Sequence, residues 1–324
     1  MTETLKVSGL SVSYATRQGS LQALRDVSLD VQSGQIVGVV GESGCGKSTL
    51  ISALMRLLPE NARVTDGRID LDGEDILTAS PRRLRAMRGR EMSVVFQDPM
   101  TSLNPVLSIG RQMRDIQYRE GVSTAEKDRR AAHMLGRVGL PDPEARLRGY
   151  PHELSGGMRQ RVAIAMATLM HPKLLIADEP TTALDATLEV QIIALLQAIQ
   201  AEIGCAILFI SHHLGVIAEL CDRVVVMYAG ETVEEGPVAD IFERPAHPYT
   251  AKLIECDPGR LKTRADTLPS IPGSLPDLTD PPSGCIFRDR CDLATEICAT
   301  QRPPRRAVSP GRWSACHHAE KVTP

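Results

Sequence analysis

A glycine-rich stretch of eight residues limits what this chain can fold into more than any other feature of its sequence. Residues Gly41-Glu-Ser-Gly-Cys-Gly-Lys-Ser48 fit the pattern G-x-x-x-x-G-K-[ST]. An apolar run typical of a strand, Gln35 to Val40, precedes the stretch, and a helical pattern from Thr49 to Leu58 follows it. A loop in this position turns backbone N–H groups toward an anion, and the helix N-terminus adds partial positive charge. The pattern therefore predicts an α/β fold with a phosphate-binding loop.

Two side chains of this loop have the chemistry that a nucleotide requires. The ammonium group of Lys47 is expected to reach the outer phosphates, and the hydroxyl of Ser48 is expected to ligate Mg²⁺. The glycines allow the backbone to approach the anion without a side chain in the way.

A second glycine motif lies about a hundred residues further along the chain. It reads Leu154-Ser-Gly-Gly-Met158 and is followed by Arg159-Gln-Arg161. Ser155 is a good N-cap, and the two glycines allow close backbone approach. The apolar pattern from Val162 to Met170 then supplies a helix. The motif therefore indicates a second helix N-terminus that is suited to an anion.

Two carboxylates follow a buried strand. The run Lys173 to Asp178 is apolar until its last residue, as expected of a parallel strand, and Glu179 comes next. Two acidic residues at a strand end could also cap a helix. Another short strand, Val94 to Phe96, leads to the amide of Gln97. A third, Cys205 to Ile210, leads to two adjacent histidines at positions 212 and 213, and by composition either could serve at the end of that strand.

Together these motifs resemble those of the ATP-binding cassette (ABC) family, and the resemblance covers essentially the whole chain. In that family the second motif usually ends in Gln where this chain has Met158. The resemblance implies a dimer in which each phosphate loop faces the other subunit's signature motif. It implies that Glu179 orients the attacking water. It also implies that His212, which follows a strand and a serine, is the switch histidine at the γ-phosphate. His213 stands where related importers commonly have Asp.

The resemblance also assigns the remaining site residues. Gln97 is expected to sense Mg²⁺ and the attacking water, and Asp178 to hold Mg²⁺ through water. Pro180 to Asp185 resembles the D-loop, with Asp185 at the dimer contact. Tyr14 fits the aromatic that stacks on adenine, although it could be an ordinary strand residue. The expected ATP-binding residues are Tyr14, Gly41, Glu42, Ser43, Gly44, Cys45, Gly46, Lys47, Ser48 and Thr49, and the expected signature residues are Leu154, Ser155, Gly156, Gly157 and Met158.

Composition favours a partner other than nucleic acid. The chain has 37 Lys and Arg against 40 Asp and Glu, and aromatic residues make up only 3 %, which argues against a base-stacking surface. The stretch Pro81 to Arg90 holds five arginines, but at helical spacing it reads as a solvated helix face rather than a nucleic-acid groove. No apolar run approaches a membrane span, and the N-terminus lacks a signal-peptide core. We therefore expect a cytosolic protein whose attachment to a membrane goes through a partner, and the resemblance to the ABC family implies a peripheral position on the cytoplasmic face of a prokaryotic cell membrane.

The predicted fold is a P-loop ABC cassette with a RecA-like mixed sheet, an antiparallel β subdomain, a helical subdomain and a small Pro- and Cys-rich extension. Alternating apolar residues near the N-terminus suit antiparallel strands. We expect the nucleotide-binding domain at residues 1–235, its helical subdomain at about 98–160, and the extension at 236–324.

Two further stretches resemble the peptide-importer branch of the family. They are Gln97-Asp-Pro-Met-Thr-Ser-Leu-Asn-Pro105 and Arg244-Pro-Ala-His-Pro-Tyr-Thr-Ala-Lys-Leu-Ile254. The resemblance implies an ATPase that powers import of dipeptides or oligopeptides. Its partners would be a second ATPase subunit, identical or a paralogue, two membrane permeases and, indirectly, an external binding protein. Import of nickel or another small solute stays open. A soluble ABC ATPase acting on nucleic acid or ribosomes would usually have two cassettes, a coiled coil or a basic linker, which this chain lacks.

Four of the eight cysteines lie close together near the C-terminus. Cys285, Cys291, Cys298 and Cys316 are separated by five, six and seventeen residues. In a cytosolic protein such clustering favours metal binding over disulfides. Some members of the peptide-importer branch hold a [4Fe–4S] cluster on cysteines at this spacing, so the resemblance implies such a cluster here. Zn²⁺, with His317 or His318 as a fourth ligand, and plain reduced thiols remain alternatives.

Overall fold

The computed structural model describes residues 2–182, 184–257 and 269–322. It divides into two compact units, of which unit 1 comprises Met1–Ala79 and Phe209–Pro324 and unit 2 comprises Ser80–Leu208. Residue 183, within the expected D-loop, lies outside the described residues. The two units differ in kind: unit 1 contains two sheets with helices and the extension, whereas unit 2 is mainly helical.

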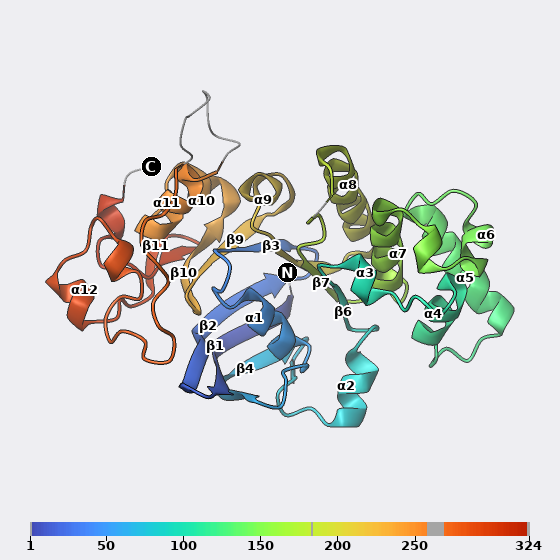
Figure 1. The fold of residues 1–324 in the computed structure, drawn as a ribbon, viewed down its shortest axis with the longest axis horizontal. Coiled ribbons are helices and arrows are strands. Elements are labelled where there is room, and N and C mark those ends of the chain that lie inside the picture. The colour runs from blue at the N-terminus through green and yellow to red at the C-terminus, as the bar shows by residue number, and fades with distance from the viewer. Residues whose placement is uncertain (1, 183, 258–268, 323–324) are drawn as a thin grey trace. The chain divides into compact units, whose positions relative to one another are not determined.

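An antiparallel sheet forms one layer of unit 1 (Figure 1). Its strands, in the order β2-β1-β4-β5, are β2 (Gly19–Gln32), β1 (Glu3–Thr16), β4 (Ala62–Leu71) and β5 (Glu74–Asp75). Val7 pairs with Leu29 on one side and with Ile69 on the other. These apolar residues are buried while their polar neighbours in sequence are more exposed, which is the pattern of a sheet with one face on a core. The predicted antiparallel subdomain is confirmed.

The second sheet of unit 1 has its buried centre at β3 (Ile36–Val40) and β9 (Arg223–Tyr228), which run parallel with Val39 opposite Val225. Every residue of β3 is buried, as expected of a strand covered on both faces. β10 (Glu231–Pro237) pairs antiparallel with β9 across the predicted turn at Ala229 and Gly230. The mixed sheet that the sequence predicts is therefore confirmed.

Helices complete unit 1. They are α1 (Lys47–Leu54), α9 (Leu214–Leu220), α10 (Val238–Glu243), α11 (Pro248–Glu255) and α12 (Glu296–Thr300), with short 3-10 turns η3 (Arg288–Arg290) and η4 (Ala319–Lys321). In α11 the side chains of Tyr249 and Ile254 are buried, so this helix of the extension is part of the core.

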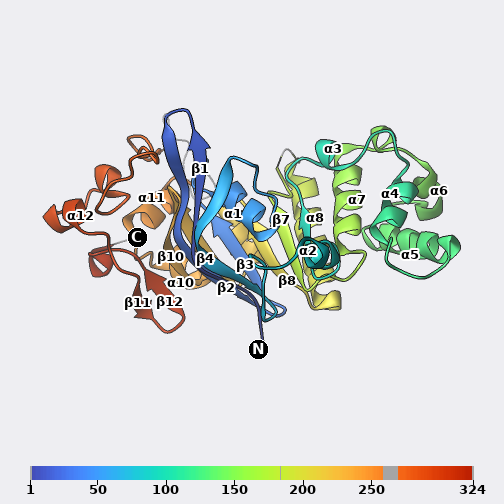
Figure 2. The same cartoon turned by 90° about the horizontal axis from the view of Figure 1, so that it is seen from below.

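The C-terminal extension continues the second sheet, which sequence reasoning did not foresee. β12 (Arg312–Ser314) pairs antiparallel with β10, and β11 (Arg306–Ser309) pairs with β12. Figure 2 shows this hairpin beside β10 and α10. The edge of β10 is thereby covered, which removes a row of unpaired backbone groups that would invite association.

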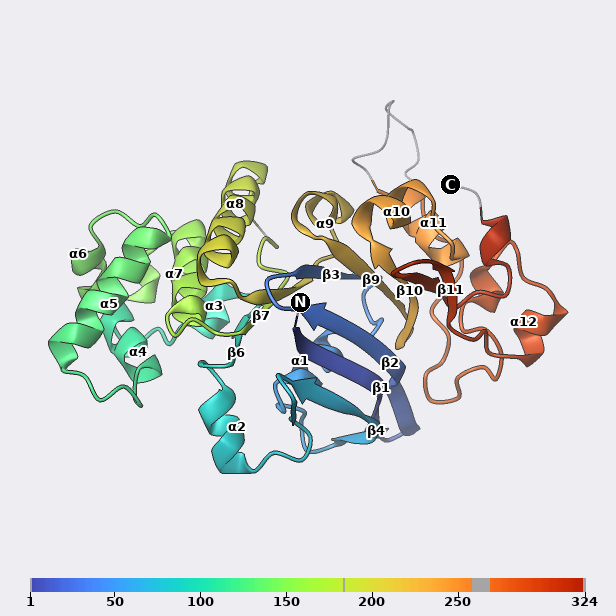
Figure 3. The same ribbon diagram turned by 180° about the vertical axis from the view of Figure 1, so that it is seen from behind.

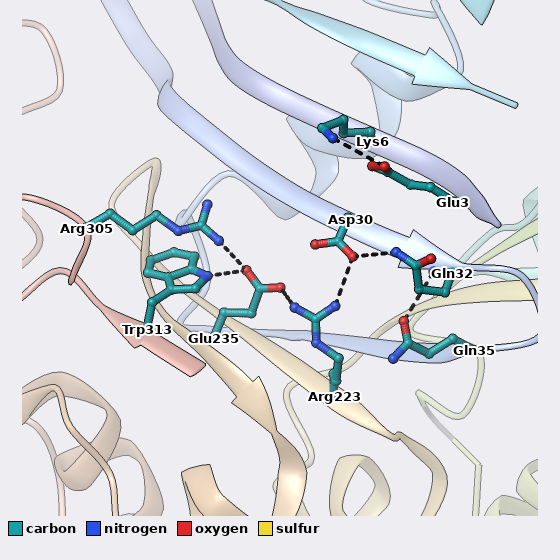
Figure 4. Close-up of polar contacts among 9 residues, drawn as sticks. All are labelled: Glu3, Lys6, Asp30, Gln32, Gln35, Arg223, Glu235, Arg305 and Trp313. Atoms are coloured by element: carbon teal, nitrogen blue, oxygen red, sulfur yellow. Dashed lines mark hydrogen bonds and ion pairs between the residues drawn. The ribbon is translucent and has the colours of Figure 1, made fainter. Parts of the chain in front are cut away.

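Side chains of β10 bind the extension as firmly as its backbone does. Glu235 is fully buried and accepts hydrogen bonds from Arg305 at 3.0 Å and from the Trp313 indole at 2.8 Å, and it also pairs with Arg223 (Figure 4). The guanidinium of Arg305 lies 3.3 Å from the centre of the Trp313 ring. The fully buried Glu234 pairs with Arg312 at 2.9 Å. Removing a single partner from such a pair leaves a buried charge uncompensated.

Burial disfavours the charged form of the Glu234 and Glu235 carboxyl groups. It raises the pKa of both Glu234 and Glu235, while the arginines from the extension act in the opposite direction. Burial likewise raises the pKa of Glu231, also on β10, which pairs with Arg25 at 3.3 Å and with Arg302 at 3.3 Å. The extension therefore contributes charge as well as packing to the second sheet.

Unit 2 consists of three strands and a group of helices. The strands β6 (Met92–Val95), β7 (Leu174–Asp178) and β8 (Ala206–Ile210, which ends in unit 1) are ordered β8-β7-β6, and β6 runs parallel to β7. The helices are α2 (Pro81–Met87), α3 (Pro99–Ser102), α4 (Ile109–Ile116), α5 (Thr124–Arg137), α6 (Pro143–Arg148), η1 (Pro151–Glu153), α7 (Gly156–Thr168) and α8 (Ala186–Ile203). Figure 3 shows α4, α5 and α6 gathered beside α7. This segment corresponds to the predicted helical region at about 98–160, although the domain boundaries remain predictions.

Helix α8 is long and apolar enough to cross a membrane by length and composition alone, and it is the one such helix among the described residues. Core helices of globular proteins also have this length and composition. One face of α8 is buried within the structure through Ile192, Leu196 and Ile199. Gly204, in the left-handed conformation with φ 67°, ends the helix as the sequence predicts.

Because one face of α8 is buried, two alanine substitutions on this helix should differ in their effect on stability. Leu196→Ala removes a fully buried side chain and should destabilise the protein by about 2–5 kcal/mol. Val190→Ala on the same helix removes a side chain that is 55 % exposed and should change stability by less than about 0.5 kcal/mol. Urea unfolding of the two variants beside the unaltered protein measures both. Equal effects would contradict the assignment of α8 to the core.

Candidate functional site

The glycine-rich loop lies between the end of β3 and the start of α1, as the sequence predicts. Gly41 has φ 154°, and a Cβ at this position would lie 2.1 Å from the Met227 carbonyl oxygen on β9. Gly46, the N-cap of α1, has φ 104°, and a Cβ there would lie 2.7 Å from Leu24. Both positions therefore require glycine, because a side chain would collide and would also strain the backbone. The loop has the shape of an anion-binding nest at a helix N-terminus.

The Lys47 side chain folds back against this loop. Its ammonium group donates to the carbonyl oxygen of Gly41 at 2.6 Å and to that of Glu42 at 3.2 Å. The Lys47 side chain is buried, whereas Ser43, Gly44 and Ser48 are exposed. A fixed positive charge thus lies beneath an open loop, an arrangement suited to a polyanion such as a triphosphate.

Two other predicted residues of unit 1 lie near this loop or the strand that precedes it. The hydroxyl of Tyr14, on β1, lies 3.2 Å from the hydroxyl of Thr49 on α1. The Ser211 amide donates to the Val39 carbonyl oxygen at 3.2 Å, which ties the segment after β8 to β3. His212 follows at once, is exposed, and contacts the ring of His213 edge-on with ring centres 4.5 Å apart. His213 is the N-cap residue of α9.

In unit 2 the structure brings two predicted catalytic residues together. β6 and β7 are parallel neighbours, with Val95 opposite Ala177, so Gln97 and Glu179 follow strands that end at the same edge. The Gln97 amide donates to Glu179 Oε2 at 2.9 Å. The hydroxyl of Thr182 donates to the same oxygen at 2.9 Å, a contact that sequence reasoning missed although Thr182 lies within the expected D-loop. Glu179 has φ 45°, a strained conformation that is common at functional sites.

The second glycine motif begins a helix, as expected. Ser155 is the N-cap of α7, and its hydroxyl accepts a hydrogen bond from the Met158 amide at 3.3 Å. Ser155 and Gly156 are exposed, whereas Leu154 and Gly157 are buried. A Cβ on Gly157 would lie 3.0 Å from Leu188 of α8. Glycine at this position therefore allows α7 and α8 to pack closely while the helix start stays accessible.

Asp185 lies at the start of α8. It caps that helix by accepting a hydrogen bond from the Leu188 amide at 2.9 Å. This local hydrogen bond fixes Asp185. Its carboxylate therefore has a structural role in addition to the expected dimer contact.

The donor atoms available for Mg²⁺ are hard oxygens. They are the Ser48 hydroxyl in unit 1, and the Asp178 carboxylate and the Gln97 amide oxygen in unit 2. Mg²⁺ bound with a nucleotide uses one or two protein oxygens and takes its other ligands from phosphates and water. These residue types fit that ion.

The expectation of an iron–sulfur cluster is wrong. Among the residues that the structure describes, no group of three or more His, Cys, Asp or Glu side chains could hold a metal ion, which removes the support for zinc as well. Burial raises the pKa of Cys285 to about 12 and that of Cys316 to about 11. His317 and His318 bond instead to the Gln301 carbonyl oxygen at 2.9 Å and to the Thr295 hydroxyl at 2.8 Å.

The structure adds two residues of the extension to the surroundings of the loop. Arg290 donates to both oxygens of Glu42, at 2.7 and 3.0 Å, and the Glu42 amide donates to the Tyr249 hydroxyl at 2.8 Å. Sequence reasoning missed both. Arg290 lies 248 residues from Glu42, and no local pattern connects them.

Comparison with known families and proteins agrees with this geometry. Residues 24–182 match the family model described as ABC transporter, and residues 233–298 match the model described as oligopeptide/dipeptide transporter, C-terminal region. The chain is 45 % identical over 320 residues to the probable peptide ABC transporter ATP-binding protein y4tR of Sinorhizobium fredii, covering 98 % of this chain and 96 % of the relative. It is 46 % identical over 313 residues to the oligopeptide transport ATP-binding protein OppD of Salmonella typhimurium, covering 96 % and 92 %.

Solved structures agree with the fold. The dimeric ATP-binding cassette MJ0796, in a post-hydrolysis state bound to ADP and phosphate, matches with a TM-score of 0.65 and 28 % identity, covering 72 % of this chain and 98 % of that one. The cbiO1 protein of Clostridium perfringens, part of the transporter complex cbiONQ, matches with a TM-score of 0.64 and 28 % identity over 80 % of this chain and 97 % of its own.

The close approach at Gly41 predicts the effect of a single methyl group. Gly41→Ala should abolish nucleotide binding, because its Cβ would displace the loop from β9. Gly73→Ala is the matched control, since Gly73 also has a positive φ of 87°, but a Cβ at Gly73 would have nothing within 4 Å. It should cost about 1 kcal/mol of stability and leave nucleotide affinity unchanged. Equilibrium titration with a fluorescent ATP analogue checks both, and retained affinity in Gly41→Ala would refute the steric argument.

Proposed function

Because this chain belongs to the ABC transporter family and is one of its ATP-hydrolysing members, we propose that it powers the import of dipeptides or oligopeptides through a membrane transporter. The observation that supports the peptide substrate most directly is the match of residues 233–298 to the C-terminal region of oligopeptide/dipeptide transporters. That region is not an isolated appendage, since Tyr249 and Arg290 within it contact the phosphate loop.

The phosphate loop would hold the triphosphate. Backbone N–H groups of the loop and the N-terminus of α1 face the anion, and the Lys47 ammonium exchanges its carbonyl partners for phosphate oxygens. The Ser48 hydroxyl would hold Mg²⁺, which neutralises charge on the phosphates when it is bound. The hydroxyl of Tyr14 lies against Thr49, which supports the proposal that its ring packs beside the adenine.

The carboxylate of Glu179 would act on the attacking water. Its Oε2 atom accepts hydrogen bonds from Gln97 and Thr182, both at 2.9 Å, and these fix the direction in which the carboxylate points. Asp178, the last residue of β7, would assist in holding Mg²⁺, and His212 would contact the γ-phosphate. Most of the catalytic effect in such a site comes from positioning and charge neutralisation rather than covalent chemistry.

The Ser155 helix start would complete the site of a second subunit. Ser155, the N-cap of α7, and Gly156 are both exposed, so this helix start is available to bind an anion that another subunit holds. We propose that the chain pairs with a second ABC ATPase subunit, a paralogue, so that each signature motif meets the γ-phosphate held by the other subunit. A relative of this fold is a dimer in its solved structure.

The transporter would contain two permease subunits and receive substrate from an external binding protein. Curated relatives are ATP-binding proteins of peptide transport systems, which supports the proposal that this chain is a peripheral subunit on the cytoplasmic side of a membrane. Import of nickel or another small solute has no specific observation in its favour. The same is true of action on nucleic acid, because acidic residues outnumber basic ones in the chain.

The role of Glu179 can be tested by an isosteric change. Glu179→Gln keeps the side-chain shape and should retain ATP binding, while turnover should fall by about 10²–10⁴-fold because the base is lost. Lys47→Ala should lose binding and turnover together, because the charge beneath the loop is removed. Steady-state phosphate release and equilibrium ATP titration separate the two outcomes. Full hydrolysis by Glu179→Gln would contradict the assignment.

The need for two subunits can be tested by dilution. If each site requires a signature motif from a partner, ATP turnover per subunit should rise with protein concentration and with added second subunit. Gly156→Asp, which puts a negative charge at the α7 N-terminus, should abolish turnover while ATP still binds to the loop. Light scattering gives the oligomeric state in parallel. A strictly monomeric preparation that hydrolyses ATP at the full rate would exclude the composite site.

A further inference from the structure

The C-terminal extension contacts the phosphate loop through one residue, Glu42. Both carboxylate oxygens of Glu42 accept hydrogen bonds from the Arg290 guanidinium, at 2.7 and 3.0 Å. The backbone amide of Glu42 donates to the Tyr249 hydroxyl at 2.8 Å. Glu42 directly follows Gly41, so the first turn of the loop is held through its backbone and its side chain at once. We call Tyr249 and Arg290 the Glu42 clamp.

Arg290 is itself held in one position. Besides the two bonds to Glu42, its guanidinium donates to the carbonyl oxygens of Pro272 at 2.8 Å and Ile271 at 3.0 Å, and to the Tyr228 hydroxyl at 3.3 Å. These five bonds use all five N–H donors of an arginine. The side chain is only 4 % exposed. Hydrogen bonding to Glu42 raises the pKa of Arg290 above its usual value, so the cation is fully charged in the folded protein.

Tyr249 is equally restricted. It is fully buried on α11, and its ring packs against Tyr228 with ring centres 4.7 Å apart and against Phe287 at 5.4 Å. An aromatic cluster from β9, α11 and the segment before η3 therefore fixes the Tyr249 hydroxyl, which accepts the hydrogen bond from the Glu42 amide. The clamp is built from rigid elements, which is what precise positioning of a loop requires.

The clamp acts on the peptide unit between Gly41 and Glu42, whose carbonyl oxygen accepts a hydrogen bond from Lys47. The Lys47 ammonium donates to the carbonyl oxygens of Gly41 and Glu42, so a shift of Glu42 would move the cation that meets the outer phosphates. The carboxylate of Glu42 is also a negative charge on the loop that binds a polyanion. Paired with a buried guanidinium, this charge is neutralised, whereas alone it would repel the triphosphate.

We infer that Arg290 and Tyr249 are positioning residues for ATP binding: the extension holds the phosphate loop through Glu42 and neutralises its charge. The inference rests on the ATPase activity of the chain and not on its peptide substrate. It assigns the extension a direct part in nucleotide affinity, through contacts between distant segments of unit 1.

A double-mutant cycle tests the pairing in the full-length chain. Arg290→Gln keeps much of the side-chain volume but removes the charge, and it should weaken binding of Mg·ATP about 10–100-fold. In the Glu42→Gln background the same change should weaken binding less than about threefold, because no unpaired carboxylate is left. Tyr249→Phe removes only the hydroxyl and should weaken binding by about three- to tenfold. Throughout, KM for ATP should rise more than kcat at saturating ATP falls.

Arg288→Gln is the matched control. Arg288 lies in the same short 3-10 turn and bonds to the Ala299 carbonyl oxygen and to Asp289 rather than to the loop. This variant should bind ATP as the unaltered chain does. A fluorescent ATP analogue and calorimetric titration with Mg·ATP give the affinities, and thermal unfolding reports whether each variant is folded.

Two results would overturn the inference. One is an ATP affinity of folded Arg290→Gln within twofold of the unaltered chain, and the other is an equal loss from Arg290→Gln with and without Glu42→Gln, which would indicate general damage to the extension. If Arg290→Gln does not fold, Arg290→Lys decides, because it keeps the charge but loses the fork and should bind ATP with intermediate, salt-dependent affinity. Affinity for ATP equal to that of the unaltered chain in Arg290→Lys at low and high salt alike would also refute the clamp. Failure of the unaltered chain to bind ATP would instead refute the ATPase assignment itself.

Discussion

The phosphate loop depends on one close approach between two strands of the second sheet. Where β3 ends, the backbone at Gly41 passes so near the Met227 carbonyl oxygen of β9 that a Cβ would lie 2.1 Å from it. Glycine allows this approach, and just beyond it the Gly41 and Glu42 carbonyl oxygens accept hydrogen bonds from the Lys47 ammonium. Helix α1 starts immediately afterwards, with glycine again at its N-cap. Anion binding, cation position and helix direction thus all follow from the packing of buried parallel strands.

The helices, strands and turns around the candidate site that the structure confirms are those that local sequence determines. A glycine loop between an apolar strand and a helix needs only neighbouring residues, and a serine N-cap followed by two glycines begins α7 as expected. The meeting of Gln97 with Glu179 was not itself deduced, but it follows from parallel pairing of β6 and β7, which brings the ends of two strands to one edge. Local sequence patterns therefore identify helices and strands, and parallel pairing then brings the residues after neighbouring strands to one edge of the sheet.

Interactions between distant segments could not be predicted in the same way. The pairing of Arg290 with Glu42 produces no periodic pattern in the sequence. Each residue resembles an ordinary surface charge in its own segment. The β11–β12 hairpin was not predicted, because the extension was identified only by its proline and cysteine content. The iron–sulfur expectation failed for a related reason, because spacing along a chain does not determine whether thiols converge on one ion, and no metal-binding group is found among the described residues.

The three buried glutamates of β10 give the extension a role beyond packing. Glu231 pairs with Arg302, Glu234 with Arg312 and Glu235 with Arg305, so each acidic side chain of this strand has a basic partner supplied from the last quarter of the polypeptide. Cutting the chain after β10 would take these arginines away from three carboxylates and would bare a sheet edge to neighbouring molecules. Trimming the tail therefore cannot leave the second sheet unchanged, because the tail supplies both backbone hydrogen bonds and positive charges to β10.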